Sequence, residues 1–217
     1  MNLGAHMLKA AEAAVVASVE LGDVNWTIDE GILPAGFFSL DDGRRVLASG
    51  CGLISFYFES AAQLTAAERL FAIRETARRL TSHTSIAASA LLAQDWIVRD
   101  RYLTIDLAPF IQKSNERLQK LAAALEMIVS DPEILGGELV IRGTRIPVYH
   151  VSASVEAGDT VKQTLADYPS LTPEAVELAR IYAQAYAPGK RSQRARQLPA
   201  GAIIISDKRI PRHAAAE

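Results

Sequence analysis

The sequence is poor in the residues that cross-links and membrane anchors require. It has a single cysteine, Cys51, among 217 residues, so an internal disulfide is excluded and a reducing compartment is favoured. No apolar run approaches the roughly 18 residues that a membrane-spanning helix needs, and the N-terminus has no secretory signal pattern. We therefore expect a cytoplasmic protein in which Cys51 is a small buried residue and not a nucleophile.

Catalytic motifs are also missing. The chain contains no GxGxxG, P-loop, HExxH or CxxC pattern, and its four histidines are scattered. His150, which follows a predicted hairpin, fits a packing role or a helix start better than the role of a general base. The sequence therefore predicts a protein that is not an enzyme, with no catalytic residue, no cofactor and no metal site.

What the chain does have is enough apolar sequence for buried cores and an uneven charge. Its hydrophobic fraction is 49%, which argues against wholesale disorder, and its length allows one large or two small domains. Residues 189–217 contain seven Lys and Arg against two Asp and Glu, whereas the rest of the chain contains 16 basic and 23 acidic residues. A basic tail on an acidic body is typical of an interaction arm, and a merely solvated terminus is the alternative.

The first part of the chain is predicted to be a winged helix-turn-helix over residues 8–80, after a predicted cloning remnant at residues 1–7. The stretches "LKAAEAAVVA" and "DVNWTIDEG" form the two helices, and "SVELG" forms the turn. Asp23 is the predicted cap of the second helix. The Asp42-Gly43 turn between apolar runs predicts a β-wing. A capping box of Thr65 and Glu68 then starts a further helix.

The stretch "LKAAEAAVVASVELGDVNWTIDEGIL" resembles the opening of MerR-like winged helix-turn-helix domains. In that pattern Ala14 fills the small core position of the first helix, Val19 the turn and Val24 the core of the recognition helix. The sequence departs from the pattern at Gly22 and Asn25, where the family has arginines. The segment carries acidic residues instead, and phosphate contacts need Lys or Arg. These acidic residues are Glu20, Asp23, Asp29 and Glu30.

Candidates for DNA binding are therefore polar, aromatic and basic side chains of the recognition helix, the wing and the following helix. They are Asn25, Trp26, Arg44, Arg45, Arg74 and Arg78, with Arg69 and Arg79 beside them. A helix-turn-helix that serves only as a packing or dimerisation module is the alternative.

Residues 81–130 are predicted to be a connector with strands and a helix. The stretch "DWIVRDRYLTIDLAPFI" predicts one or two strands with Ile97, Leu103, Ile105 and Leu107 as buried candidates. The helix "NERLQKLAAALEMI" carries a stripe of Leu118, Leu121, Leu125 and Ile128. Such a stripe is either core or a seam for a second copy. We expect a homodimer or a higher assembly, because helix-turn-helix proteins reach two half-sites as pairs.

Residues 131–188 are predicted to be a hairpin followed by helices. Residues 139–141 and 146–148 form the two strands, and Gly143 takes a positive φ in the turn between them. Asp159 and Thr172 are the predicted caps of two later helices, with Pro173 at the first position of the second one. Arg142 and Arg145 flank the turn, where a surface or protein-contact role is favoured over a phosphate grip.

The stretches "DPEILGGELVIRGTRIPVYHV" and "AGDTVKQTLADYPSLTPEAVELARIYAQAY" resemble the bacterial domain of unknown function 433. With a MerR-like domain in front, the whole chain resembles the large VapB-type antitoxins. The resemblance implies a VapC-type PIN-domain toxin as partner, which is a Mg²⁺-dependent ribonuclease. It further implies neutralisation of that toxin, binding to operator DNA, and dimeric or higher assembly.

The predicted fold class is mainly α with small β-hairpins, as two winged or helix-turn-helix-like domains joined by a helical and β connector. The predicted function is an antitoxin that inhibits a ribonuclease and regulates its own operon. A stand-alone, ligand-responsive DNA-binding regulator is the alternative.

The basic tail, residues 189–217, is the predicted toxin-binding segment. Its apolar run "AIIIS" can add a strand to a partner or fill a groove, and its arginines can pair with the carboxylates of a Mg²⁺ site. Inhibition by the helical body is the alternative. The candidate residues are Arg191, Arg194, Arg196, Ile203, Ile204, Ile205, Lys208, Arg209 and Arg212.

Overall fold

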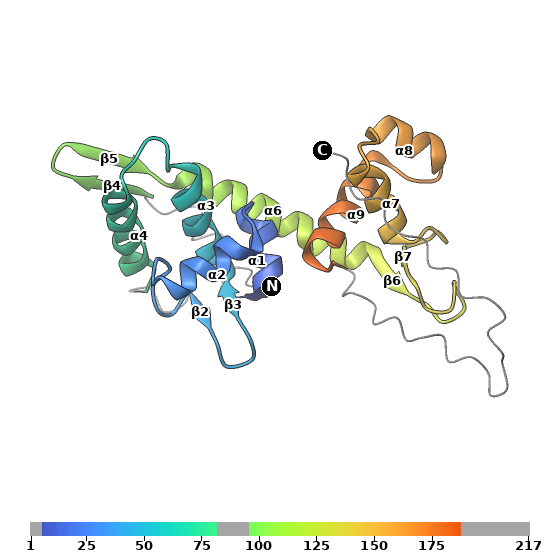
Figure 1. Ribbon diagram of the computed structural model, residues 1–217, viewed down its shortest axis with the longest axis horizontal. Coiled ribbons are helices and arrows are strands. Elements are labelled where there is room, and N and C mark those ends of the chain that lie inside the picture. The colour runs from blue at the N-terminus through green and yellow to red at the C-terminus, as the bar shows by residue number, and fades with distance from the viewer. Residues whose placement is uncertain (1–5, 82–95, 188–217) are drawn as a thin grey trace, which may run out of the picture. The chain divides into compact units, whose positions relative to one another are not determined.

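The structure, a computed structural model, describes residues 6–81 and 96–187 (Figure 1). Within these ranges eight α-helices dominate, and the strands form one three-stranded and two two-stranded sheets, all antiparallel. The predicted mainly helical fold class with small hairpins is confirmed. None of the helices in these ranges is both long and apolar enough to cross a membrane.

Helices α1 (Ala10–Ala17) and α2 (Leu21–Asp29) form the predicted helix-turn-helix. Ser18 closes α1 in the left-handed conformation, with φ 59°, and so turns the chain sharply toward α2. The predicted cap of α2 was wrong, because Glu20 and not Asp23 is the N-cap residue. Asp23 lies in the first turn, where its carboxylate accepts the Glu20 N–H at 3.1 Å.

The predicted wing is a hairpin of β2 (Phe38–Ser39) and β3 (Arg45–Leu47), with Gly43 at a positive φ in its loop (Figure 1). A third strand, β1 (Met7–Lys9), pairs with the other edge of β3, so the sheet order is β1-β3-β2. The sequence did not predict β1, because a strand this short carries no periodic signal.

Helix α3 (Cys51–Glu59), which follows a 3-10 turn at Ala48–Gly50, was also not predicted. It is buried over most of its length, so its sequence shows no polar face. The Cys51 side chain is fully buried, and burial raises the pKa of its thiol to about 12. The expected burial of this cysteine is confirmed, and the raised pKa disfavours the reactive thiolate. Helix α4 (Ala66–Thr81) begins at the predicted capping box, where Thr65 and Glu68 exchange hydrogen bonds.

The connector contains the hairpin of β4 (Ile97–Asp100) and β5 (Leu103–Asp106). Of its predicted core residues, Ile105 and Leu107 are buried, whereas Ile97 and Leu103 are only half-buried. The sequence missed Val98, which is fully buried opposite Ile105.

Helix α6 (Ala108–Met127) is longer than predicted at its start and shorter at its end. It starts with a proline in its first turn, a position that tolerates the missing N–H. The leucine stripe of this helix, which was one candidate for a dimer interface, is not an exposed surface. Leu118 and Leu121 are buried in the core of this chain, Leu125 is exposed, and Ile128 leaves the helix to begin a strand.

The predicted hairpin of residues 139–141 and 146–148 is confirmed only in part, at an antiparallel bridge between Val140 and Pro147. Strand β7 (Leu139–Ile141) pairs with β6 (Ile128–Ser130), at the end of α6. The segment after the Gly143 turn contributes only a bridge at Pro147 and a 3.0 Å hydrogen bond from the Ile141 N–H to the Ile146 carbonyl. Proline has no N–H to continue a ladder, so helix α7 (Val148–Glu156) begins directly after it.

Two more helices, α8 (Val161–Asp167) and α9 (Pro173–Ala185), complete this part of the chain. Thr160, and not the predicted Asp159, caps α8. The predicted cap of α9 is confirmed, because the Thr172 hydroxyl accepts the Ala175 N–H at 3.1 Å.

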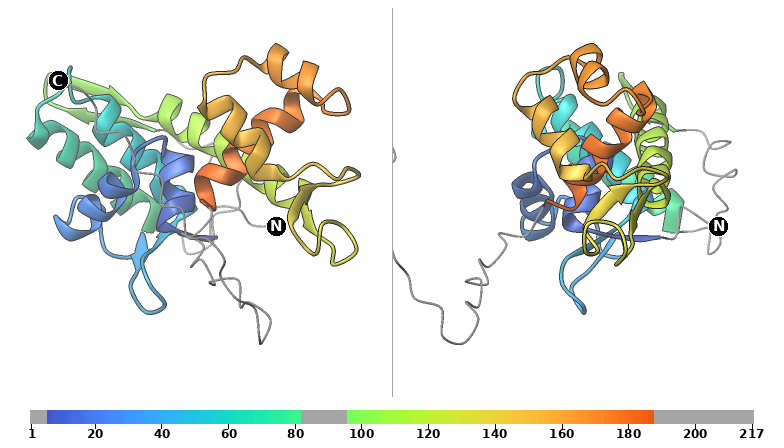
Figure 2. Two further views of the ribbon diagram at one scale, coloured as in Figure 1. Left: turned by 45° about the vertical axis from the view of Figure 1, so that its right-hand side comes forward. Right: turned by 90° about the vertical axis from the view of Figure 1, so that its right-hand side faces the viewer.

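Helix α9 belongs to two apolar cores. One side of α9 packs with β6, β7 and α7, whereas Leu178, Ile181 and Ala185 join the larger core formed around α1, α3 and α6. Figure 2 shows α6, in green, passing beside α1, α3 and α9, all of which contact it. The helix-turn-helix and the C-terminal helices therefore share one continuous packing arrangement.

Candidate functional site

The outer side of α2 exposes apolar and acidic side chains. Leu21 and Trp26 are 46% and 42% exposed. The Trp26 ring packs against Tyr57 and Phe58 of α3, with ring centroids 5.8 and 6.0 Å apart. Residues 6–81 carry seven Lys and Arg against ten Asp and Glu. This part of the chain therefore lacks the positive excess that a phosphate-binding surface usually has.

Both wing arginines are paired with acids of the same chain. The Arg44 guanidinium donates to the Asp29 carboxylate at 2.7 Å and to the Asn25 carbonyl at 3.1 Å, which ties the wing to α2. Arg45 donates to Asp42 at 2.6 Å. The hydrogen bond to Asp29 raises the pKa of Arg44. The structure thus brings together Arg44 and Asn25, two of the predicted DNA-binding residues, and pairs both wing arginines with acidic side chains.

The arginines of α4 differ in their availability. Arg78 and Arg79 both donate to the Glu75 carboxylate, at 2.9 and 3.0 Å. These hydrogen bonds lower the pKa of Glu75 to about 2, and the one from Arg78 has the larger effect. Arg69 lies over the Tyr57 ring, 4.2 Å from its centroid. Arg74 is exposed. Of the predicted DNA-binding residues of α4, Arg74 is therefore the one whose charge is presented most openly.

Arg142 and Arg145, which flank the Gly143 turn, differ in their contacts. The Arg142 guanidinium donates twice to the carbonyl of Glu126 at the end of α6. Arg145 is exposed. Arg142 and Arg145 are therefore not arranged to bind one phosphate group together at this turn. In residues 6–81 and 96–187 no group of three or more His, Cys, Asp or Glu side chains is arranged to hold a metal ion.

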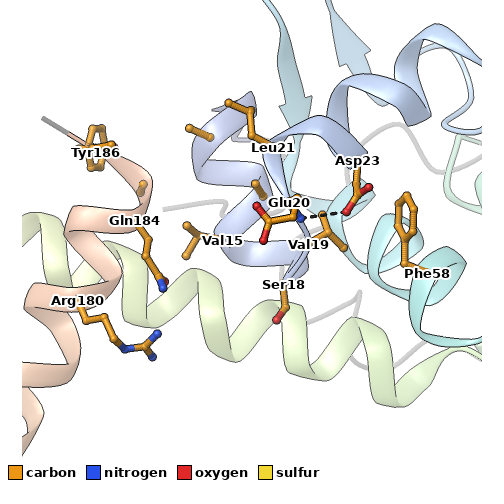
Figure 3. A pocket seen from close by; sticks show the side chains of 14 residues that line it. Val15, Ser18, Val19, Glu20, Leu21, Asp23, Phe58, Arg180, Gln184 and Tyr186 are labelled. Carbon is orange, nitrogen blue, oxygen red and sulfur yellow. Dashed lines mark hydrogen bonds between the residues drawn. The ribbon is translucent and has the colours of Figure 1, made fainter. Parts of the chain in front are cut away.

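A cleft of about 840 Å³ lies between the helix-turn-helix and the end of α9 (Figure 3). Its first wall consists of α1 and the turn into α2, and includes Glu20 and Asp23. Arg180 and Gln184 of α9 form the opposite wall. No sequence pattern indicated this site, because its walls are more than 150 positions apart in the chain.

Tyr186 fixes α9 to α1 at the edge of this cleft. Its hydroxyl donates a short hydrogen bond to the Glu12 carboxylate, which is only 8% exposed and also accepts the Lys9 N–H at 2.7 Å. The carbonyl of Tyr186 accepts the Tyr149 hydroxyl at 2.7 Å, and the Tyr182 ring lies 4.9 Å from the Tyr186 ring. Burial, followed by the hydrogen bond to Glu12, raises the pKa of Tyr186.

Residues 128–183 match the family model described as "Protein of unknown function (DUF433)". The chain is also 54% identical over 208 residues to the uncharacterized protein y4eO of Sinorhizobium fredii (strain NBRC 101917 / NGR234), which covers 96% of this chain and 94% of that protein. The chain belongs to the family of y4eO. The family match confirms the predicted domain of unknown function 433 in the C-terminal part of the chain.

One solved structure is also similar, at a distance. The X-ray crystal structure of Rv2018 from Mycobacterium tuberculosis matches with a TM-score of 0.30 and 15% identity, over 81% of this chain and 96% of that chain. This similarity is too low for any inference about fold or function. The predicted toxin-binding residues, from Arg191 to Arg212, all lie outside the described residues.

Proposed function

We propose that this protein is a non-enzymatic, cytoplasmic antitoxin of the large VapB type, which binds and inhibits a PIN-domain ribonuclease and regulates its own operon. The proposal rests on one observation above all. Helix α9 contributes to the core of the winged helix-turn-helix and to the core of the DUF433 helices, so it joins the two modules. The resemblance of the sequence to VapB-type antitoxins supplies the class of partner.

The proposed inhibition uses the basic tail of residues 189–217. A Mg²⁺-dependent ribonuclease holds its metal with clustered carboxylates, and arginine pairs with carboxylates through two parallel hydrogen bonds. The apolar run Ile203–Ile205 is proposed to anchor the tail on the toxin. Two copies of the chain are proposed to act together on two DNA half-sites.

Co-expression with the neighbouring reading frame tests this function. The expected result is a complex that co-purifies through a tag on this protein, in which the Mg²⁺-dependent ribonuclease activity of the partner is suppressed. A metal-binding carboxylate variant of the partner serves as the control for ribonuclease activity. A neighbour without ribonuclease activity, or one that does not bind, would overturn the proposal.

Deleting the tail is expected to release the toxin. A chain that ends at Ala187 should lose inhibition by more than about a hundredfold, because breaking a buried ion pair costs about 3–5 kcal/mol. The measurement is the concentration of this protein that halves the partner's ribonuclease activity. Thermal unfolding of the truncated chain gives the control for its fold. Full inhibition by the truncated chain assigns inhibition to the helical body instead.

Neutralising the acids that hold the wing arginines is expected to strengthen operator binding. The double change Asp29→Asn and Asp42→Asn frees Arg44 and Arg45, and each phosphate contact adds about 0.9 to the slope of log K against log salt. We expect tighter binding and a slope steeper by about two contacts, measured by fluorescence anisotropy. Glu30→Gln, at the end of α2, is the matched control. An unchanged slope removes the wing from the DNA interface.

One observation favours the alternative function, a ligand-responsive DNA-binding regulator. The cleft between α1–α2 and α9 is large enough for a small molecule, because such sites usually occupy about 300–1,000 Å³. A chain that binds operator DNA without any toxin partner, and whose DNA affinity responds to a small molecule, is the result expected from this alternative.

A further inference from the structure

The cleft holds opposite charges that face each other without pairing. Glu20 and Asp23 lie on the wall formed by the turn into α2, and Arg180 extends from α9 on the other side (Figure 3). No ion pair within 4.0 Å joins Arg180 to an acid of the described chain. The Asp23 carboxylate accepts the Glu20 N–H at 3.1 Å within the turn, so the two walls offer Arg180 on one side and the Glu20 carboxylate on the other.

The floor between these charges is apolar and incompletely covered. Val15, Val19 and Phe58 line the cleft and pack against the core, yet each is only half-buried. Ala14 and Ala185 close the floor beneath them. A molecule that covered this floor would remove apolar surface from water, which is the main source of affinity in small-molecule sites.

Neutral polar groups and a rigid wall complete the site. Ser18, at the end of α1, and Gln184, on the α9 wall, also line the cleft. The hydrogen bond from Tyr186 to Glu12 holds the end of α9 against α1, so this wall is positioned before a ligand arrives.

We propose that this cleft binds a small zwitterionic amphiphile. Its ammonium group pairs with Glu20, its carboxylate pairs with Arg180, and its apolar body lies over Val15 and Phe58. Arginine recognises a carboxylate through two parallel hydrogen bonds, which fixes the orientation of the ligand. Because one wall belongs to the helix-turn-helix and the other to α9, the bound molecule bridges the two modules and stabilises the folded chain.

This site does not depend on the proposed antitoxin function, and the test uses the full chain alone. The probes are γ-aminobutyrate, ε-aminocaproate and ω-aminocaprylate, which carry opposite charges at the ends of apolar chains of increasing length. Isothermal titration calorimetry is expected to show one preferred length. Hexylamine and hexanoate, which carry one charge each, are expected to bind at least about tenfold more weakly, or by about 1.4 kcal/mol.

Two variants test the contribution of each cleft wall to ligand binding. With Arg180→Gln, the preferred amino acid should bind no more tightly than hexylamine, and with Glu20→Gln it should lose at least about tenfold in affinity. Arg145→Gln and Glu30→Gln, which lie outside the cleft, are the matched controls and should bind like the wild type. Thermal unfolding confirms that each variant is folded. Absence of binding by all three probes, or equal binding of wild type and Arg180→Gln, would overturn the proposal.

Discussion

Gly52→Val is expected to lower the free energy of unfolding by about 1–3 kcal/mol, because overpacking forces neighbouring atoms apart. Gly52 lies in α3 where α6 crosses it. A Cβ atom at this position would lie 2.5 Å from Cδ1 of Ile111 and 3.1 Å from its Cα. The side chain of Ile111 can rotate, but its backbone cannot move without separating the two helices. The measurement is urea-induced unfolding followed by circular dichroism.

Gly22 offers the matched control in another helix. It lies in α2, and a Cβ atom there would have no neighbour within 4 Å. Gly22→Ala should be neutral or stabilising by up to about 1 kcal/mol, since alanine has the higher helix propensity. Gly52→Ala should be destabilising despite that gain. Equal effects of alanine at the two positions would contradict the close approach of α3 and α6.

Tyr186→Phe is expected to destabilise the chain by about 1–3 kcal/mol, because it leaves a buried carboxylate without one of its partners. Glu12 is 8% exposed, and after the change it retains the hydrogen bond from the Lys9 N–H. Tyr182→Phe is the control, since its ring packs on the same cluster while no hydrogen bond of its hydroxyl is found among the described residues. Urea-induced unfolding of both variants at pH 7 measures the difference.

The Tyr186 hydroxyl predicts that the stability of the folded chain depends on pH in the alkaline range. Burial, and then the hydrogen bond to Glu12, raises the pKa of Tyr186 in the folded chain above its ordinary value of about 10. Folding therefore favours the protonated phenol, so its stabilisation is complete below the unfolded pKa and is lost as the pH rises through the folded pKa. The wild type should lose stability more steeply than Tyr186→Phe above pH ~10. Parallel stability profiles would contradict this.

Local sequence signals determined much of the secondary structure. The helix-turn-helix, the wing at Gly43, and the helix starts at Thr65 and Thr172 follow from residues within a few positions of each other, and the structure has all of them. Such features are readable because caps and turns depend on short-range hydrogen bonds and backbone preferences. The burial of Cys51 was equally predictable from its isolation in the sequence.

Other features escaped the sequence because they depend on distant partners. Helix α3 shows no periodic pattern, since it is buried over most of its length. The ladder partner of β7 is β6 at the end of α6, and the predicted pairing with the segment after Gly143 is limited to one bridge. The caps Glu20 and Thr160 were each missed when a nearby aspartate was preferred. The Thr160 cap could have been predicted, because Thr160 and Gln163 form a capping box three residues apart.

The candidate sites also divide into features that the sequence predicts and features that depend on tertiary contacts. Residue types alone identified the wing arginines and the basic tail as positive segments, because charge is a property of composition. Only the tertiary structure decided that Arg44 is paired with Asp29, that Leu118 faces the core of its own chain, and that α9 closes a cleft against α1. These contacts join residues far apart in the sequence, and their energies depend on distances that no local pattern encodes.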